Sequence, residues 1–163
     1  MQRTQTEIDS SLQMPSLLPS SFVTPELKDK DNLPCTDLIL FKSILNRSRR
    51  LNDTIASTNL SNQIQSKSQC TQLLEFPRNG HQQRLNAINS CLQQLKSQAD
   101  SHGIHPKKPL IRPDVEDRSE VAVVQQNDPF LQRQMELLKG ELIIEDIVHE
   151  QALTKIEAHC RFL

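Results

Sequence analysis

The sequence predicts an all-α protein, a small antiparallel helical bundle with coiled-coil character. Apolar residues recur at helical spacing in three segments, at about 37–57, at about 67–100 and from 129 onwards. The run from Val121 to Val124 is too short and isolated to found a sheet. The nine prolines fall mostly outside the periodic segments, as expected of a helical protein.

We predict that residues 1–34 form a disordered N-terminal arm and that residues 35–163 form one helical, cysteine-containing domain. The arm is rich in Ser, Thr, Pro and Gln and shows no sustained hydrophobic period. Such a composition buries too little apolar surface to offset the entropy of ordering the chain. A chain of 163 residues with 36% hydrophobic content supports a single domain with a modest core.

The first helix is predicted over about 37–57. Thr36 or Asp37 can cap it, because their side-chain oxygens accept hydrogen bonds from free amides of the first turn. Its apolar residues fall on one side of a helical wheel and are Leu38, Phe41, Ile44, Leu45, Leu51 and Ile55. The cations on the other side, which we expect to face solvent, are Lys42, Arg47 and Arg50.

A polar connection over 59–66 leads to the second helical region, at about 67–100. Pro77 removes a backbone donor and Gly80 raises the backbone entropy, so a kink or a break is expected there. Beyond this interruption one apolar stripe contains Leu85, Ile88, Cys91, Leu92 and Leu95. The stripe predicts that the Cys91 side chain points toward the core.

Arg84 lies at the edge of that apolar stripe, which is unusual for a charged residue. One interpretation is a partly buried guanidinium paired with a carboxylate. The other is an arginine whose aliphatic part covers the stripe while its charged end reaches solvent. The sequence leaves both interpretations open.

A linker over about 101–127 leads to a third helix, which Asp128 can cap and Pro129 can begin. The first apolar stripe of this helix contains Leu131, Met135, Leu138 and Leu142. After Gly140 the stripe shifts, first to Ile144, Ile147 and Val148 and then to Leu153, Ile156 and Cys160. Either the helix breaks near Gly140, or partners cover both of its faces.

No pattern typical of an enzyme, a cofactor site or a metal site occurs in the sequence. A chain with three glycines has no glycine-rich phosphate loop, and the acidic group Glu141, Glu145 and Asp146 is expected on a solvated helix face. There is no C-x-x-C motif, and the histidines do not lie at zinc-ligand spacing; they are His81, His102, His105, His149 and His159. We therefore expect no catalytic, cofactor-binding or metal-binding residues.

Charge and hydropathy give further expectations about partners. Nineteen Lys and Arg nearly cancel twenty Asp and Glu, so no overall field favours nucleic acid or an anionic membrane. No run of about 18 apolar residues exists, so no transmembrane segment is expected. The N-terminal residues, with Arg3 as the only cation before Lys28, do not fit a cleavable presequence.

The four cysteines, Cys35, Cys70, Cys91 and Cys160, are the strongest chemical signal. If Cys70 and Cys91 lie on one continuous helix, their roughly 31 Å separation forbids a disulfide, so they pair only if the chain folds back between them. Three pairings exist. A simple up-down-up arrangement favours Cys35 with Cys91 and Cys70 with Cys160. Four buried free thiols in a reducing compartment are the alternative.

Three segments, Cys35 to Ile55, Cys70 to Cys91 and Glu141 to Cys160, together resemble the caffeine-induced death protein 2 family. This family is also called coiled-coil domain-containing protein 58, and it includes mitochondrial intermembrane-space CXnC motif proteins. Besides the cysteines, the positions that carry the resemblance most specifically are Arg49, Asp53, Arg84 and Ile88. The resemblance covers about 35–163 and leaves out the N-terminal arm.

The resemblance implies a non-enzymatic protein of the mitochondrial intermembrane space that enters without a presequence. Its cysteines would be oxidised by a disulfide-relay oxidoreductase of the Mia40 type. It would assist the import of other proteins through inner-membrane translocases. The alternative is a cytosolic or nuclear coiled-coil adaptor, in which the buried cysteines remain reduced and the amphipathic helices dock a partner.

Overall fold

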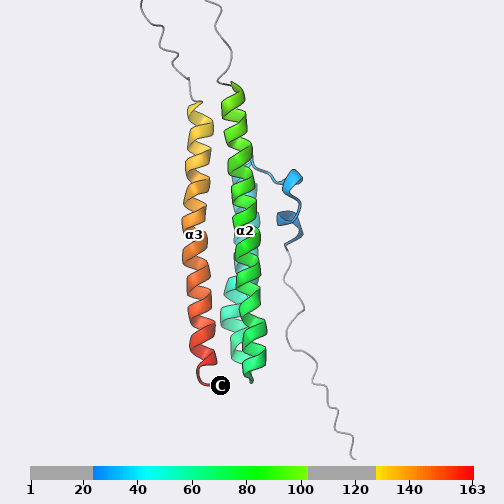
Figure 1. Cartoon of the computed structure of the whole chain (residues 1–163), viewed down its shortest axis with the longest axis vertical. Helices are drawn as coiled ribbons and strands as arrows, with labels where there is room; N and C mark the ends of the chain where they lie inside the picture. The colour runs from blue at the N-terminus through cyan, green and yellow to red at the C-terminus, as the bar shows by residue number, and fades with distance from the viewer. Residues whose placement is uncertain (1–23, 103–127) are drawn as a thin grey trace, which may run out of the picture.

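The computed structural model describes residues 24–102 and 128–163, and these form the predicted all-α bundle (Figure 1). No strand occurs within these two ranges. The long helices α2 (Lys67–His102) and α3 (Pro129–Cys160) lie side by side and antiparallel, with α1 (Leu38–Arg49) behind α2 (Figure 1). The chain therefore has the up-down-up arrangement. No described helix has both the length and the hydrophobicity that crossing a bilayer requires.

Part of the predicted N-terminal arm packs on the bundle. Residues 24–34 contain two short 3-10 turns, η1 (Pro25–Leu27) and η2 (Lys30–Asn32), which lie beside α2 (Figure 1). Leu27 and Leu33 are buried in the same hydrophobic cluster as α1 and α2 side chains. Leu27 and Leu33, which lie within the predicted arm, therefore belong to the core of the helical domain. Residues 1–23 of the arm, and 103–127 of the predicted linker, lie outside the described residues.

The N-terminus of α1 is as predicted, since the Asp37 carboxylate accepts a hydrogen bond of 3.0 Å from the Leu40 amide. After α1 the helix widens into the π-helical turns η3 (Arg50–Thr54) and η4 (Ala56–Leu60), which are followed by the 3-10 turn η5 (Ser61–Gln63). From α1 to η5, two series of buried residues recur every four positions. One is Ile44, Ser48, Asn52, Ala56, Leu60 and Ile64, and the other is Leu45, Arg49, Asp53, Ser57 and Ser61. In an α-helix this spacing drifts around the axis by about 40° per turn, whereas wider π-helical turns absorb the drift.

This widening corrects two expectations from the sequence. Leu51 and Ile55, which a regular α-helical wheel places in the core stripe, are only partly buried. Leu60 and Ile64, which lie in the predicted polar connection, belong instead to a hydrophobic cluster with residues of α2 and α3. A wheel drawn at 3.6 residues per turn cannot anticipate the change, because the change of period arises from packing against the other helices.

Of the kink or break expected at Pro77 and Gly80, the break is wrong, because α2 runs as one helix from Lys67 to His102. Both residues are buried. A Cβ at Gly80 would lie 2.5 Å from the Cβ of Asn52 in η3 and 2.7 Å from its Cγ, so the glycine allows two helical segments to approach closely. Tertiary packing overrides the local helix-breaking tendency of this stretch.

Helix α3 begins as predicted, with Pro129 at its first turn and the Asp128 carboxylate accepting from the Phe130 amide at 2.9 Å. It does not break at Gly140. One face is buried against the bundle, whereas Ile144 and Ile147 on the second face are exposed. Of the two alternatives drawn from the shift in the stripe, the break is wrong, and the covering of both faces by partners stays a prediction, because no described residue covers the second face.

Candidate functional site: two disulfides and a buried ion cluster

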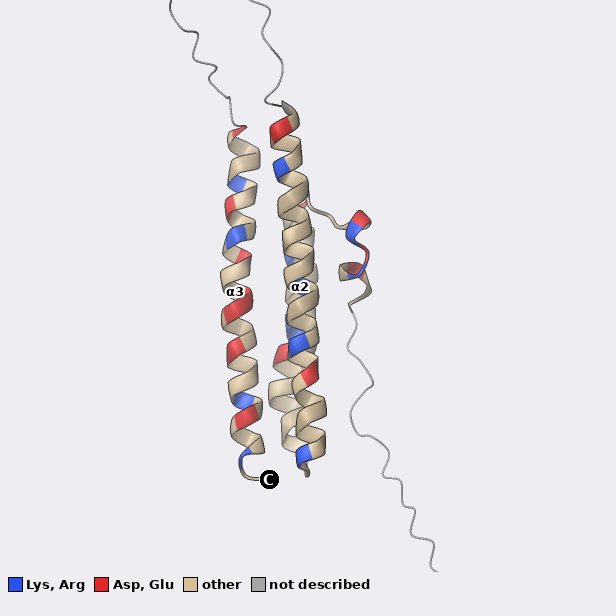
Figure 2. Ribbon diagram, viewed as in Figure 1, with Lys and Arg blue, Asp and Glu red and all other residues tan. Residues whose placement is uncertain are grey.

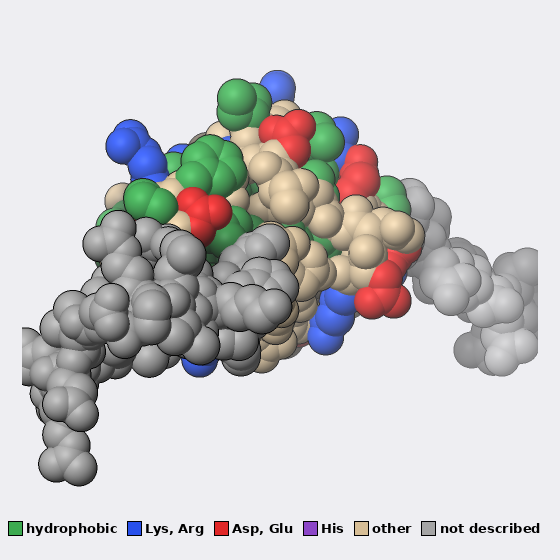
Figure 3. Space-filling view, turned by 90° about the horizontal axis from the view of Figure 1, so that it is seen from above, with side chains coloured by type: hydrophobic (Ala, Val, Ile, Leu, Met, Phe, Trp, Pro, Cys, Tyr) green, Lys and Arg blue, Asp and Glu red, His purple; other side chains and the backbone are tan. Residues whose placement is uncertain are grey.

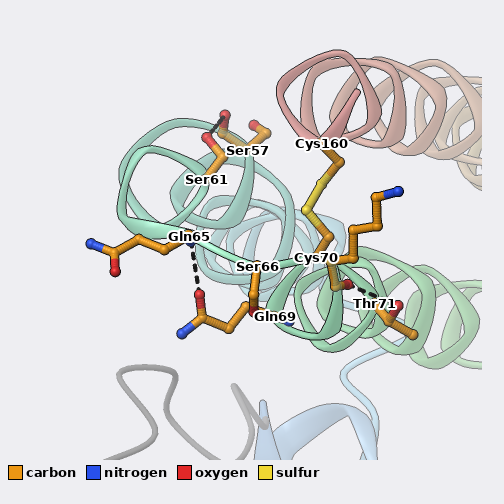
Figure 4. The surroundings of a disulfide bond; sticks show 9 residues. Ser57, Ser61, Gln65, Ser66, Gln69, Cys70, Thr71 and Cys160 are labelled. Atoms are coloured by element: carbon orange, nitrogen blue, oxygen red, sulfur yellow. Dashed lines mark hydrogen bonds between the residues drawn. A yellow bond between two sulfur atoms is a disulfide. The ribbon is translucent and has the colours of Figure 1, made fainter. Parts of the chain in front are cut away.

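Two disulfides join segments that are distant in the sequence. The Cys35–Cys91 bond links the segment before α1 to α2, with 5.0 Å between Cα atoms. The Cys70–Cys160 bond links the start of α2 to the end of α3, with 6.1 Å between Cα atoms (Figure 4). This is the pairing that the up-down-up arrangement favours. The continuity of α2 rules out a Cys70–Cys91 bond, and no free cysteine is left.

Each disulfide lies in a separate hydrophobic cluster. Cys35 and Cys91 are buried with residues of α1, α2 and the first half of α3. Cys70 is buried in a second cluster near the C-terminus of α3, while Cys160 is only partly buried there. The residues drawn around this second bond are polar, and Ser61 Oγ donates a 2.8 Å hydrogen bond to the Ser57 carbonyl (Figure 4).

The two bridges close long loops, with sequence separations of 56 for Cys35–Cys91 and 90 for Cys70–Cys160. In the chain-entropy model, closing a loop of either length contributes about 4 kcal/mol to stability. The loops overlap between Cys70 and Cys91, so the two contributions are not independent. Each is a large fraction of the stability that a small domain ordinarily has.

Between the two hydrophobic clusters lies a buried ion cluster, which consists of Arg49, Asp53, Arg84, Glu141 and Glu145. At its centre the Arg84 side chain is fully buried. Arg84 Nε donates to Glu145 Oε2 at 2.7 Å, and Arg84 Nη2 lies 2.7 Å from Asp53 Oδ2. Arg84 is therefore the buried guanidinium with carboxylate partners, and the interpretation that its charged end reaches solvent is wrong.

Arg49 provides the second cation of the ion cluster. Its Nε donates to Glu145 Oε1 at 2.6 Å and its Nη2 donates to Glu141 Oε2 at 2.9 Å. Glu145 thus receives one arginine on each carboxylate oxygen. Arg49 and Asp53 make no direct ion pair with each other; they are connected through Glu145 and Arg84. Charge-assisted bonds of this kind connect η3 and all three α-helices at one level of the bundle.

The expectation that Glu141 and Glu145 lie on a solvated face is wrong, because both side chains are buried. Only their neighbour Asp146 is exposed, at 77% of its side chain. The signal for their burial is present in the sequence, since both continue the three- and four-residue spacing of Leu138. Residue type alone indicates solvent at these two positions, whereas their helical position indicates burial.

The ion cluster holds two arginines and three carboxylates, so its anions are in excess. Lys42 Nζ, on the exposed edge, lies 3.1 Å from Glu141 Oε1 and supplies the remaining positive charge. Burial raises the pKa of Asp53 to about 6; Arg84 opposes this shift and Glu145 adds to it. Asp53 therefore binds a proton more readily than an ordinary aspartate does.

Two histidines lie beside the ion cluster. The rings of His81 and His149 stack with centroids 4.1 Å apart, and His81 Nδ1 is 3.5 Å from Glu145 Oε2. Burial, followed by the proximity of His81, lowers the pKa of His149. Within the ranges that the structure describes, no group of three potential ligands is placed to hold a metal ion.

The candidate residues from the sequence are therefore brought together in one structural unit. Arg49, Asp53 and Arg84 share the ion cluster, and Ile88, one turn after Arg84, is fully buried in the adjacent hydrophobic cluster. The buried ion pairs favour one register of the helices, because a displacement leaves a buried charge unpaired. Of the predicted solvated cations, Arg47 and Arg50 are exposed, and Arg47 pairs with Glu26.

No protein-family model matches this sequence, and no solved structure matches it. Membership of the caffeine-induced death protein 2 family therefore stays a prediction.

Proposed function

We propose that this chain is a non-enzymatic protein of the mitochondrial intermembrane space. In this proposal a disulfide-relay oxidoreductase forms both bridges, and the folded protein assists import of other proteins through inner-membrane translocases. The observation that supports it most is that both disulfides join segments far apart in the chain. Structural bridges of this type form and persist in oxidising compartments.

The arrangement of the site agrees with a structural role for the sulfur bonds. The bridges lie on either side of the ion cluster along α2, since Cys70, Arg84 and Cys91 follow one another in that helix. The two disulfides therefore hold together helices whose buried ion pairs are favourable in only one register. The segments that resemble the caffeine-induced death protein 2 family include these same cysteines and arginines. The import role is what that resemblance implies.

Location and oxidation state are tested together in intact mitochondria from cells that express the full chain. Protease should digest the protein only after the outer membrane is ruptured, and alkylation followed by non-reducing mass spectrometry should find both bridges and no free thiol. Four alkylated cysteines in protein recovered from the cytosol would contradict the proposal.

The import role needs a separate test, because location alone does not establish it. Mitochondria depleted of the protein should import a radiolabelled matrix-targeted precursor more slowly than normal mitochondria. Re-expression of the wild type should restore the rate, whereas a variant with all four cysteines replaced by serine should not. Equal import rates in depleted and normal mitochondria would remove this role.

The second candidate function is a cytosolic or nuclear coiled-coil adaptor with reduced cysteines. The observation that favours it is that the ion cluster and the two hydrophobic clusters already pack the helices against one another without sulfur bonds. It predicts that dithiothreitol leaves the melting temperature unchanged. The intermembrane-space proposal instead predicts a clear decrease in the melting temperature. Reduction would open two long loops and so raise the conformational entropy of the unfolded chain.

A further inference from the structure

We infer that the outer face of α3 is the contact surface of a symmetric, antiparallel dimer of this chain. The outer face is defined by Phe130, Leu137, Gly140, Ile143, Ile144 and Ile147. Its five apolar side chains are each between 41% and 65% exposed. This inference concerns the surface of the folded chain and does not depend on the location proposed above.

The outer face has the pattern of a helix-helix seam. Leu137, Gly140, Ile144 and Ile147 follow at spacings of three, four and three residues, which is the repeat of a coiled-coil interface. From Phe130 to Ile147 the apolar side chains extend along about 26 Å of helix. Seen along the bundle, exposed hydrophobic side chains lie among charged ones (Figure 3). Monomers rarely expose a continuous apolar strip of this kind.

The face is self-complementary about its midpoint near Leu142. In an antiparallel pair Leu137 of one chain meets Ile147 of the second copy, because both lie five residues from that midpoint. Gly140 and Ile144 lie two residues from it on either side. A Cβ built on Gly140 has nothing within 4 Å, so the isoleucine of the second copy has room to approach the backbone there. A twofold axis repeats each contact, as a closed dimer requires.

Charged residues of both signs occur in both halves of α3, with Arg133 and Lys139 before its middle and Lys155 after it (Figure 2). Lys139 and Asp146, at 59% and 77% side-chain exposure, lie on a third side of α3, away from both the bundle and the outer face. Shape rather than charge therefore makes the outer face complementary to a second copy.

A hollow in the surface of α3 provides an independent fit. It has a volume of about 380 Å³ and is lined by Ile147, Glu150, Gln151, Thr154 and Lys155. Phe130 and Thr154 lie twelve residues from the midpoint, on opposite sides of it. The antiparallel register therefore brings the exposed Phe130 ring of one chain to the hollow of the other.

Sedimentation velocity of the oxidised full chain, across a wide concentration range, tests this inference. The wild type should show a concentration-dependent monomer–dimer equilibrium. Ile144→Glu should abolish the dimer while leaving the circular dichroism spectrum of the monomer unchanged, because the side chain is already exposed. Ile39→Glu is the matched control, since Ile39 is an 86% exposed isoleucine on α1, and it should dimerise as the wild type does.

A wild type that stays monomeric at high concentration would overturn the inference. Equal loss of the dimer in Ile39→Glu would also overturn it.

Discussion

Arg84 donates a 2.7 Å hydrogen bond from its Nε to Glu145 Oε2, and neither side chain is exposed to solvent. Arg84 lies 14 residues after Cys70 in α2, and Glu145 lies 15 residues before Cys160 in α3. On antiparallel helices these nearly equal offsets mean that the Cys70–Cys160 bond and the ion pair hold the same register. The sulfur bridge limits how the helices can be arranged, and the buried charges select one arrangement.

Glu145→Gln should destabilise the fold by about 3 to 5 kcal/mol, because it breaks two buried ion pairs at once, those that Glu145 makes with Arg49 and with Arg84. Asp146→Asn, one residue further along, should change the free energy of unfolding by no more than about 0.5 kcal/mol. Chemical denaturation of the oxidised proteins measures both values. Equal effects of the two substitutions would show that the ion cluster contributes nothing specific.

Asp53→Asn should alter the pH dependence of stability. The pKa of Asp53 is raised to about 6 in the folded chain, against an ordinary value of 3.8, so the folded state binds the proton more tightly than the unfolded state. The stabilisation by this proton is complete below about pH 4 and is lost as the pH rises through 6, by up to about 3 kcal/mol.

The wild type should therefore lose stability relative to Asp53→Asn between pH 4 and pH 6. The measurement is the free energy of unfolding of both proteins across this range, with Asp146→Asn as the control, since Asp146 is exposed. A constant difference between wild type and Asp53→Asn would mean that the Asp53 carboxyl keeps its ordinary pKa.

Two alanine substitutions at helical glycines should act in opposite directions. Gly80→Ala should destabilise the fold by about 1 to 3 kcal/mol, because its Cβ would lie 2.5 Å from the Asn52 Cβ. Gly140→Ala should stabilise it by about 0.5 to 1 kcal/mol, because its Cβ meets nothing within 4 Å and alanine favours the helix.

The glycine variants are compared by thermal unfolding in an Ile144→Glu background, which keeps the proposed dimer contact out of the measurement. The same sign for both substitutions would contradict the close approach of α2 to η3 at Gly80. The comparison thus separates a glycine that packing requires from one that the single chain does not need.

Mild reduction should open the Cys70–Cys160 bond before the Cys35–Cys91 bond. Cys160 is partly exposed, whereas both cysteines of the other bond are buried, and thiol–disulfide exchange requires access to a sulfur atom. Timed reduction, alkylation and mass spectrometry should detect labelled Cys70 and Cys160 first. Earlier labelling of Cys35 and Cys91 would show that the N-terminal segment opens more readily than the end of the bundle.

The sequence by itself determined the helical class and most helix ends. Local chemistry is enough for these features: Asp37 and Asp128 cap helices, Pro129 begins one, and the apolar spacing marks a buried face. The direction of the Cys91 side chain toward the core also followed from that spacing. Each of these features depends on residues within a few turns of one another, so the linear pattern contains the information.

The tertiary structure decided the features that depend on residues distant in the sequence. Gly80 allows the close approach of Asn52, so α2 continues where its local composition indicates a break. Glu141 and Glu145 are buried because arginines from two other helical segments meet them, and residue type alone suggested solvent. The up-down-up arrangement favoured the observed disulfide pairing, and only the folded structure shows which of the three pairings forms. The free energy of a buried charge or a sulfur bond depends on its partner, and only folding brings the partners together.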